Sequence, residues 1–162
     1  MKKLKLYLET SLFGFAFDDK DHNKEKKESV LQLFAQIRDG LMDGFVSGLV
    51  IKELLMSPQP FADAFLEIIR DYGIHEFIKD ETEAELLAAA FLREGIVPER
   101  FRNDAFHVAI AVAGEFDVLV TLNCVHIANE FKARGFRAIQ YREGYARELS
   151  IRTPMEMIQY DY

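Results

Sequence analysis

The sequence has a single cysteine, no apolar run long enough to cross a membrane, and no linker, repeat or low-complexity segment. Because Cys124 is alone, the chain can form neither an intramolecular disulfide nor a four-cysteine zinc site. The longest apolar runs end within about ten residues, whereas a membrane-spanning helix needs roughly 20. The N-terminal lysines lead into a short alternating segment and not into the apolar stretch of a signal peptide. We therefore expect a cytoplasmic protein with no membrane segment.

An excess of basic residues is also absent, since the formal net charge is −7. This charge argues against a tight, non-specific nucleic-acid binder, which is usually basic. It argues less against a nuclease, because part of the acidic excess would then be metal-binding carboxylates. The chain has 162 residues, of which 49% are apolar, so it can bury one core. We expect one domain over residues 1–162.

Short apolar segments with strand-like and helix-like spacing alternate along the chain. Glycine follows four of the helical patterns, as Gly40, Gly73, Gly95 and Gly135. This alternation predicts an α/β protein with a mainly parallel sheet in a single three-layer domain. The expected strands are 3–8, 44–47, 74–78, 117–121 and 138–141, and the expected helices are 24–39, 49–56, 61–72, 81–93, 104–113 and 126–134, with a short turn or helix at 155–158.

Four acidic or amide residues stand where an apolar strand ends or a helix begins: Glu9, Glu53, Asp104 and Asn123. Ligand sites of parallel α/β sheets lie at such positions, outside the carboxyl ends of the strands. Three carboxylates in one crevice repel each other unless cations are bound between them. The pattern therefore indicates a metal-dependent hydrolase of phosphodiesters, with the amide oxygen of Asn123 as a weak fourth ligand.

Each of these residues also has an ordinary structural explanation. Glu9 is equally well read as a solvated residue at the start of a loop, and Glu53 as an exposed helix glutamate. Asp104 favours a helix N-terminus through the helix dipole, although Asn103 already offers an N-cap and leaves Asp104 to face a cation. Asn123 suits a turn that closes a strand.

The histidines allow two further hypotheses. Asp104 and His107 lie on nearly the same helix face and suggest a zinc site. The alternative is that His107 is a helix histidine with a satisfied hydrogen bond. His126 near Cys124 suggests a cysteine–histidine nucleophile. The alternative is that Cys124 is buried and inert.

A phosphohydrolase that acts on small phosphates is a weaker hypothesis, because the sequence has no glycine-rich phosphate loop.

The four acidic or amide residues and the motifs around them, in this order and spacing, resemble those of the PIN-domain ribonucleases along nearly the whole chain. The matching pieces are E-T-S at 9–11, a glutamate after a short strand at Glu53, D-x-x-H-x-A at 104–109, and D-x-L-x-T-x-N at 117–123. The segment 151–156 is similar to the I-x-T-P-x-E ending of many members. The E-T-S start and the N-x-x-H of Asn123 and His126 resemble one sub-group of the family.

The resemblance implies an endoribonuclease in which Glu9, Glu53 and Asp104 bind Mg²⁺ or Mn²⁺ and Asn123 completes the catalytic set. It also implies an RNA substrate, a toxin role with a small antitoxin protein as partner, and a homodimer. Around the substrate we expect Arg100 and Arg102 to hold phosphate, Thr121 to position a water or a phosphate oxygen, and Thr10 and Ser11 to orient the Glu9 carboxylate. Most members have Asp at the first position and many have Asp at the fourth. Because Glu9 and Asn123 differ from this pattern, the alternative is a catalytically weak PIN-like module that binds RNA or protein.

Overall fold

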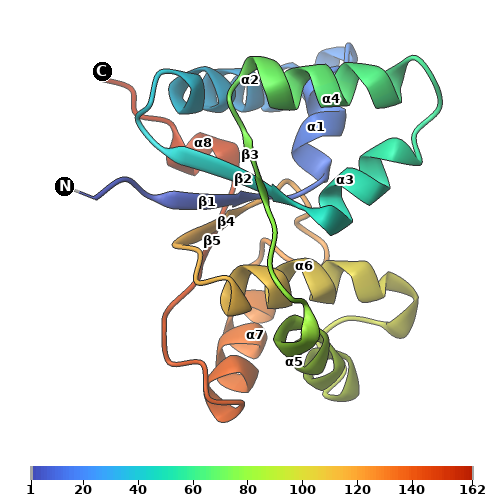
Figure 1. Ribbon diagram of the computed structural model, residues 1–162, viewed down its shortest axis with the longest axis vertical. Coiled ribbons are helices and arrows are strands. Elements are labelled where there is room, and N and C mark those ends of the chain that lie inside the picture. Colours follow the sequence, from blue (N-terminus) through green and yellow to red (C-terminus); the bar gives the residue numbers. More distant parts are fainter. Residues whose placement is uncertain (1, 162) are drawn as a thin grey trace.

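The computed structural model, described here for residues 2–161, has a five-stranded sheet in which every pairing is parallel (Figure 1). The strand order is β3-β2-β1-β4-β5. The predicted α/β class with a mainly parallel sheet is therefore confirmed. The strands are β1 (Lys5–Leu8), β2 (Asp43–Ser47), β3 (His75–Phe77), β4 (Val118–Val120) and β5 (Ser150–Arg152).

Helices cover both faces of the sheet and make the three expected layers. In Figure 1, α1, α2, α3, α4 and α8 lie above the sheet, and α5, α6 and α7 lie below it. The helices are α1 (Ser11–Ala16), α2 (Lys24–Arg38), α3 (Gly48–Leu55), α4 (Phe61–Asp71), α5 (Thr82–Arg93), α6 (Arg102–Ala113), α7 (Glu130–Arg142) and α8 (Pro154–Met157), with 3₁₀ turns η1 (Asp21–Asn23) and η2 (Glu99–Phe101).

The core lies on both sides of the central strands β1 and β4. Leu6, Tyr7 and Leu8 are fully buried although they are consecutive and point alternately to the two faces. Helices on both faces explain this burial, because a parallel strand inside such a sandwich has no solvent side. The charged end of β1 is accommodated differently: Lys5 Nζ donates to the carbonyl of Gly114 at 2.9 Å and lies 4.2 Å from the centre of the Phe116 ring.

The prediction for residues 126–141 was wrong. A helix was expected to end before Gly135 and a strand to follow at 138–141, but α7 runs continuously from Glu130 to Arg142. Gly135 is needed for packing and not for a turn, since a Cβ at this position would lie 2.7 Å from Ile96 Cδ1. The last strand is β5, which overlaps the segment 151–156 and pairs with β4, where Ser150 lies opposite Val118.

Two helix starts also differ from expectation. A short helix, α1, begins at Ser11 directly after the first strand, where no helix was expected. Helix α6 begins at Arg102, so Asn103 lies inside the helix and is not its N-cap. Asp104 nevertheless stays in the first turn, where a negative charge is favourable.

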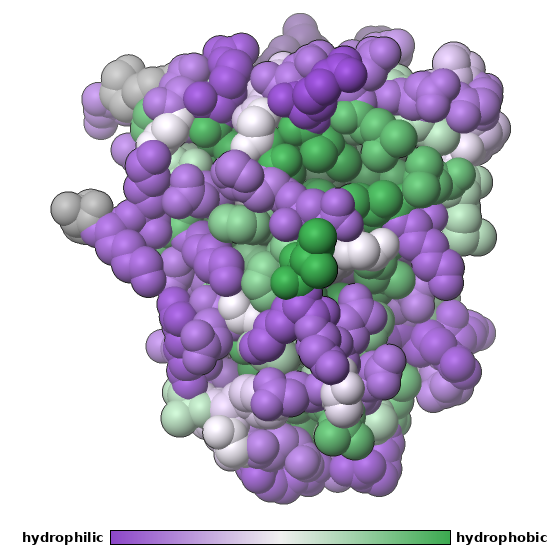
Figure 2. All heavy atoms as spheres, viewed as in Figure 1, coloured by the Kyte–Doolittle hydropathy of each residue, from purple (hydrophilic) through white to green (hydrophobic). Residues whose placement is uncertain are grey.

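The surface combines charged helix faces with a few clustered apolar side chains. On the face shown in Figure 2, apolar atoms gather at the upper right, over α3 and α4. The exposed apolar side chains of this region are Leu55, Met56, Phe61 and Leu66. Within residues 2–161, no helix combines the length and the apolar character that crossing a membrane requires.

Candidate active site at the carboxyl edge of the sheet

The predicted site residues reach one edge of the sheet because all strands run in the same direction. Glu9 follows β1, Glu53 lies on the helix that follows β2, and Thr121 and Asn123 follow β4. Since β2, β1 and β4 are adjacent, their carboxyl ends lie side by side. Asp104 comes to this edge from the first turn of α6.

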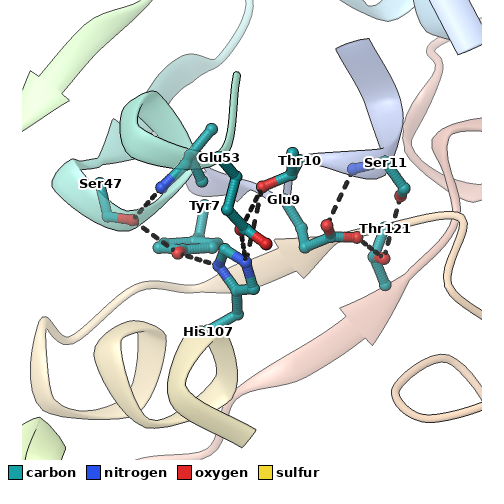
Figure 3. Close-up of polar contacts among 9 residues, drawn as sticks. Tyr7, Glu9, Thr10, Ser11, Ser47, Glu53, His107 and Thr121 are labelled. Atoms are coloured by element: carbon teal, nitrogen blue, oxygen red, sulfur yellow. Dashed lines mark hydrogen bonds and ion pairs between the residues drawn. The ribbon is translucent and has the colours of Figure 1, made fainter. Parts of the chain in front are cut away.

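Glu9 is buried and both of its carboxylate oxygens are bonded within the protein (Figure 3). The Thr121 hydroxyl donates to Oε1 at 2.5 Å, and the Ser11 backbone N–H donates to Oε2 at 2.8 Å. The side chain is only 4% exposed. These bonds compensate the cost of burying a carboxylate. Glu9 therefore links the end of β1 to the end of β4.

The predicted hydroxyl residues are used in the same way. Thr121 also accepts a hydrogen bond from the Asn123 backbone N–H at 2.9 Å. Ser11 Oγ accepts from the Leu122 backbone N–H at 3.0 Å, and Thr10 Oγ1 donates to Glu53 at 2.8 Å. Thus the backbone of Ser11 bonds Glu9, whereas the hydroxyl of Thr10 bonds Glu53.

A chain of hydrogen bonds runs from the start of α3 to the Glu53 carboxylate (Figure 3). Ser47 Oγ accepts from the Val50 backbone N–H at 3.2 Å and lies 2.8 Å from Tyr7 Oη. Tyr7 Oη lies 2.6 Å from His107 Nδ1, and His107 Nε2 lies 2.5 Å from Glu53 Oε1. A neutral imidazole satisfies every member, with Ser47 donating to Tyr7, Tyr7 to Nδ1, and Nε2–H to the carboxylate.

This chain keeps Glu53 ionised. Burial by itself raises the pKa of the Glu53 carboxyl, but the hydrogen bonds from His107 and from the Thr10 hydroxyl oppose this and the pKa lies below its ordinary value. Tyr7 is fully buried, and burial raises its pKa well above the ordinary value, so its hydroxyl stays protonated and available as a donor. His107 is 1% exposed and is the satisfied helix histidine, not half of an Asp104–His107 zinc pair.

Asp104 is held by the second histidine. His126 Nδ1 lies 2.7 Å from Asp104 Oδ2, and the His126 backbone N–H donates to Asn123 Oδ1 at 3.1 Å. Asn123 therefore closes the turn after β4 and places His126 against Asp104. Cys124 is exposed and not buried, and no hydrogen bond or ion pair joins its thiol to His126 in the part of the chain described here.

Glu53 and Asp104 line a common open hollow of about 670 Å³. Its remaining wall comes from η2 and the first turn of α6, which carry both predicted arginines, Arg100 and Arg102. Arg102 is paired with Glu99. Arg100 forms no ion pair among residues 2–161, so its charge is available to an anion. The volume is within the range of small-ligand sites.

The described side chains do not form a ready site for a divalent cation. Carboxylate oxygens are suitable ligands for Mg²⁺ and Mn²⁺, but no three His, Cys, Asp or Glu side chains within residues 2–161 are grouped to hold a metal ion. Glu9 is bonded to Thr121 and Ser11, Glu53 to His107, and Asp104 to His126. For metal binding, Glu9 would have to exchange a partner, because both of its carboxylate oxygens are bonded, whereas these bonds of Glu53 and Asp104 use Oε1 and Oδ2 only.

The structure thus brings Glu53, Asp104 and the two arginines into one hollow and turns Glu9 and Asn123 to internal bonds. The contribution of Tyr7 was missed, because a tyrosine inside an apolar strand has the pattern of a core residue. The pairing of His126 with Asp104 was also missed, although the spacing of three from Asn123 is a turn signal that could have placed it. A comparison of the chain with models of protein families and with curated proteins found no match to either.

Proposed function

We propose that this protein is a ribonuclease of the PIN type that hydrolyses phosphodiester bonds of RNA in the hollow between α3 and α6. The observation that carries the proposal is the lining of this hollow, where the carboxylates of Glu53 and Asp104 face the same space as Arg100 and Arg102. Acidic groups next to cations that bind phosphate suit hydrolysis of a phosphodiester.

In this proposal the side chains have separate tasks. Arg100, which has no carboxylate partner in the described chain, binds a phosphate of the RNA backbone. Glu53 is ionised at neutral pH because its pKa is lowered, so it can accept a proton from an attacking water. His107 and Tyr7 hold the Glu53 carboxylate in place. His126 does the same for Asp104.

Mg²⁺ or Mn²⁺ remains part of the proposal through the resemblance alone. The cation would bind at Glu53 and Asp104, with Glu9 as a third ligand only after release from Thr121. Because such release costs a buried hydrogen bond, we expect weak metal affinity in comparison with a site whose ligands are already grouped.

The second candidate is a catalytically weak PIN-like module that binds RNA or a protein. The inward bonding of Glu9 and Asn123 favours it, since two of the four predicted catalytic groups then serve the structure. Metal-dependent cleavage distinguishes the two functions, because a binding module would hold RNA without cutting it.

The biological role proposed with the ribonuclease is that of a toxin restrained by a small antitoxin protein, in a protein that forms homodimers. Light scattering coupled to size-exclusion chromatography tests the dimer. Growth arrest on expression, with rescue by co-expression of the adjacent gene, tests the toxin role. Normal growth at high expression of an RNA-cleaving protein would contradict it.

The decisive experiment combines metal titration with RNA cleavage. Mn²⁺ and Mg²⁺ are titrated into the purified protein by calorimetry, and cleavage of labelled single-stranded RNA is followed with each metal. Asp104→Asn should lose both binding and cleavage, whereas the control Asp63→Asn, an exposed site on α4, should keep both. Absence of binding up to millimolar metal in a folded protein would refute the metallonuclease and favour the binding module.

A further inference from the structure

An aromatic side chain stands at the rim of the proposed active site. Phe101 ends η2, directly before α6, and its side chain is 37% exposed. It lines the same hollow as Glu53 and Asp104. Exposure alone does not distinguish it, because Phe131 on α7 is 89% exposed. The contacts of the Phe101 ring do.

The Phe101 ring rests against a fixed imidazole. The ring centres of Phe101 and His126 are 4.2 Å apart, with 38° between the planes. His126 is in turn held by the Asp104 carboxylate and by Asn123. The orientation of Phe101 is therefore coupled to the carboxylate that lines the hollow. Phe131 has no ring or cation contact within the described residues.

The same ring is in contact with an exposed cation. The Arg100 guanidinium lies 4.9 Å from the ring centre, and Arg100 is exposed. A cation–π contact in water is weaker than the stacking of a base on an aromatic ring. A nucleobase can therefore replace the guanidinium on the ring, while Arg100 moves to the phosphate next to that base.

We propose that Phe101 is a stacking platform for one unpaired nucleobase of single-stranded RNA, with Arg100 bound to the adjacent phosphate. The inference rests on the proposed function and specifies its substrate as single-stranded. In a duplex the faces of each base are covered by neighbouring bases, so a side chain on the protein surface cannot stack on them. Stacking accepts any base, since every base has a π face, and we expect little sequence preference from this contact.

A tryptophan probe tests the contact directly, because the chain contains no tryptophan. In Phe101→Trp, titration with a short single-stranded RNA should quench the indole fluorescence, whereas a duplex of the same sequence should not. Phe131→Trp is the matched control, and its fluorescence should stay unchanged with either RNA. Titrations are made with Mg²⁺ and, separately, with EDTA to prevent cleavage.

Affinity measurements separate stacking from simple apolar contact. Phe101→Leu keeps an apolar side chain without a π face and should weaken binding of the single-stranded RNA at least about fivefold, while Phe101→Tyr should bind as the wild type does. Circular dichroism verifies that each variant is folded, and the tryptophan titration gives a reading that does not depend on the leucine variant.

The outcomes distinguish this inference from the proposed function. RNA binding by the wild type without quenching in Phe101→Trp, or with unchanged affinity in Phe101→Leu, would overturn the stacking role and leave the ribonuclease standing. Equal quenching by single-stranded and duplex RNA would also overturn it. A wild-type protein that neither binds nor cleaves single-stranded RNA in either buffer would refute the ribonuclease, and the stacking role with it.

Discussion

Replacement of Tyr7 by phenylalanine tests the hydrogen-bond chain that supports Glu53. The change removes one oxygen atom and leaves the ring in contact with Phe116, whose centre is 5.5 Å away. It removes the 2.6 Å bond to His107 and the 2.8 Å bond to Ser47. All three groups are at most 1% exposed, so water cannot replace the hydroxyl.

The expected loss follows from what remains without a partner. Ser47 keeps its bond from the Val50 N–H, whereas His107 Nδ1 is left buried without a donor. An unsatisfied buried polar atom costs about 1–3 kcal/mol, and a lost hydrogen bond about 1 kcal/mol. We expect Tyr7→Phe to lower the free energy of unfolding by about 2–3 kcal/mol. For a chain of this size this corresponds to a fall in Tm of roughly 4–12 °C.

Urea unfolding followed by circular dichroism measures this loss. Tyr141→Phe is the matched control, because the Tyr141 side chain is 46% exposed and its hydroxyl has no bond among residues 2–161. The control should stay within about 0.5 kcal/mol of the wild type. If Tyr7→Phe also stays within that range, His107 is not held by Tyr7 and the described chain of bonds is wrong.

Three further predictions concern two contacts at the same edge of the sheet and a close approach at the end of α6. Thr121→Val should destabilise the protein by about 2–3 kcal/mol in urea unfolding, because it removes the hydroxyl that donates to the buried Glu9 carboxylate; an unchanged midpoint would contradict this. Glu53 has a lowered pKa, so its stabilising effect is present above its ordinary pKa of 4.5 and is lost as the pH falls through the lower folded-state value. The difference in unfolding free energy between wild type and Glu53→Gln should therefore shrink below about pH 4.5, and a constant difference from pH 7 to pH 3 would argue against an ionised, hydrogen-bonded Glu53. Gly114→Ala should cost about 1–3 kcal/mol, because the new Cβ would lie 2.9 Å from the Ile110 carbonyl oxygen; the control Gly14→Ala meets no atom within 4 Å and should be neutral or stabilising in the same urea assay.

Local patterns predicted most of the secondary structure and the order of its elements. The helices that begin at Lys24 and Phe61 have apolar residues at helical spacing and end at glycines with positive φ, Gly40 at +84° and Gly73 at +65°. Gly135 does not end a helix. It lies inside α7, where the absence of a side chain allows close packing on Ile96. A glycine needed for contact with a distant segment has no local signature, and the strand after it was misplaced for that reason.

The candidate site divides in the same way. The sequence predicts which polar residues lie at strand ends and helix starts, because strand alternation and helix periodicity are local properties. These residues are Glu9, Glu53, Asp104 and Asn123. The parallel sheet then brings them to one edge by topology. Which of them face the hollow depends on bonds between residues that are about a hundred positions apart, such as Glu9 with Thr121. Such bonds cannot be read from spacing.

The sequence by itself therefore determined the α/β class, the parallel sheet and the edge at which its polar residues meet, since these follow from periodicity, turn residues and the handedness of the chain. Only the tertiary structure decided the partners. It paired Glu53 with His107 and Asp104 with His126, buried Glu9 against Thr121, and left Phe101 and Arg100 at the rim of the hollow. The physical reason is that a buried charge takes whichever donor the packed elements bring within hydrogen-bond distance, and that donor comes from a different part of the chain.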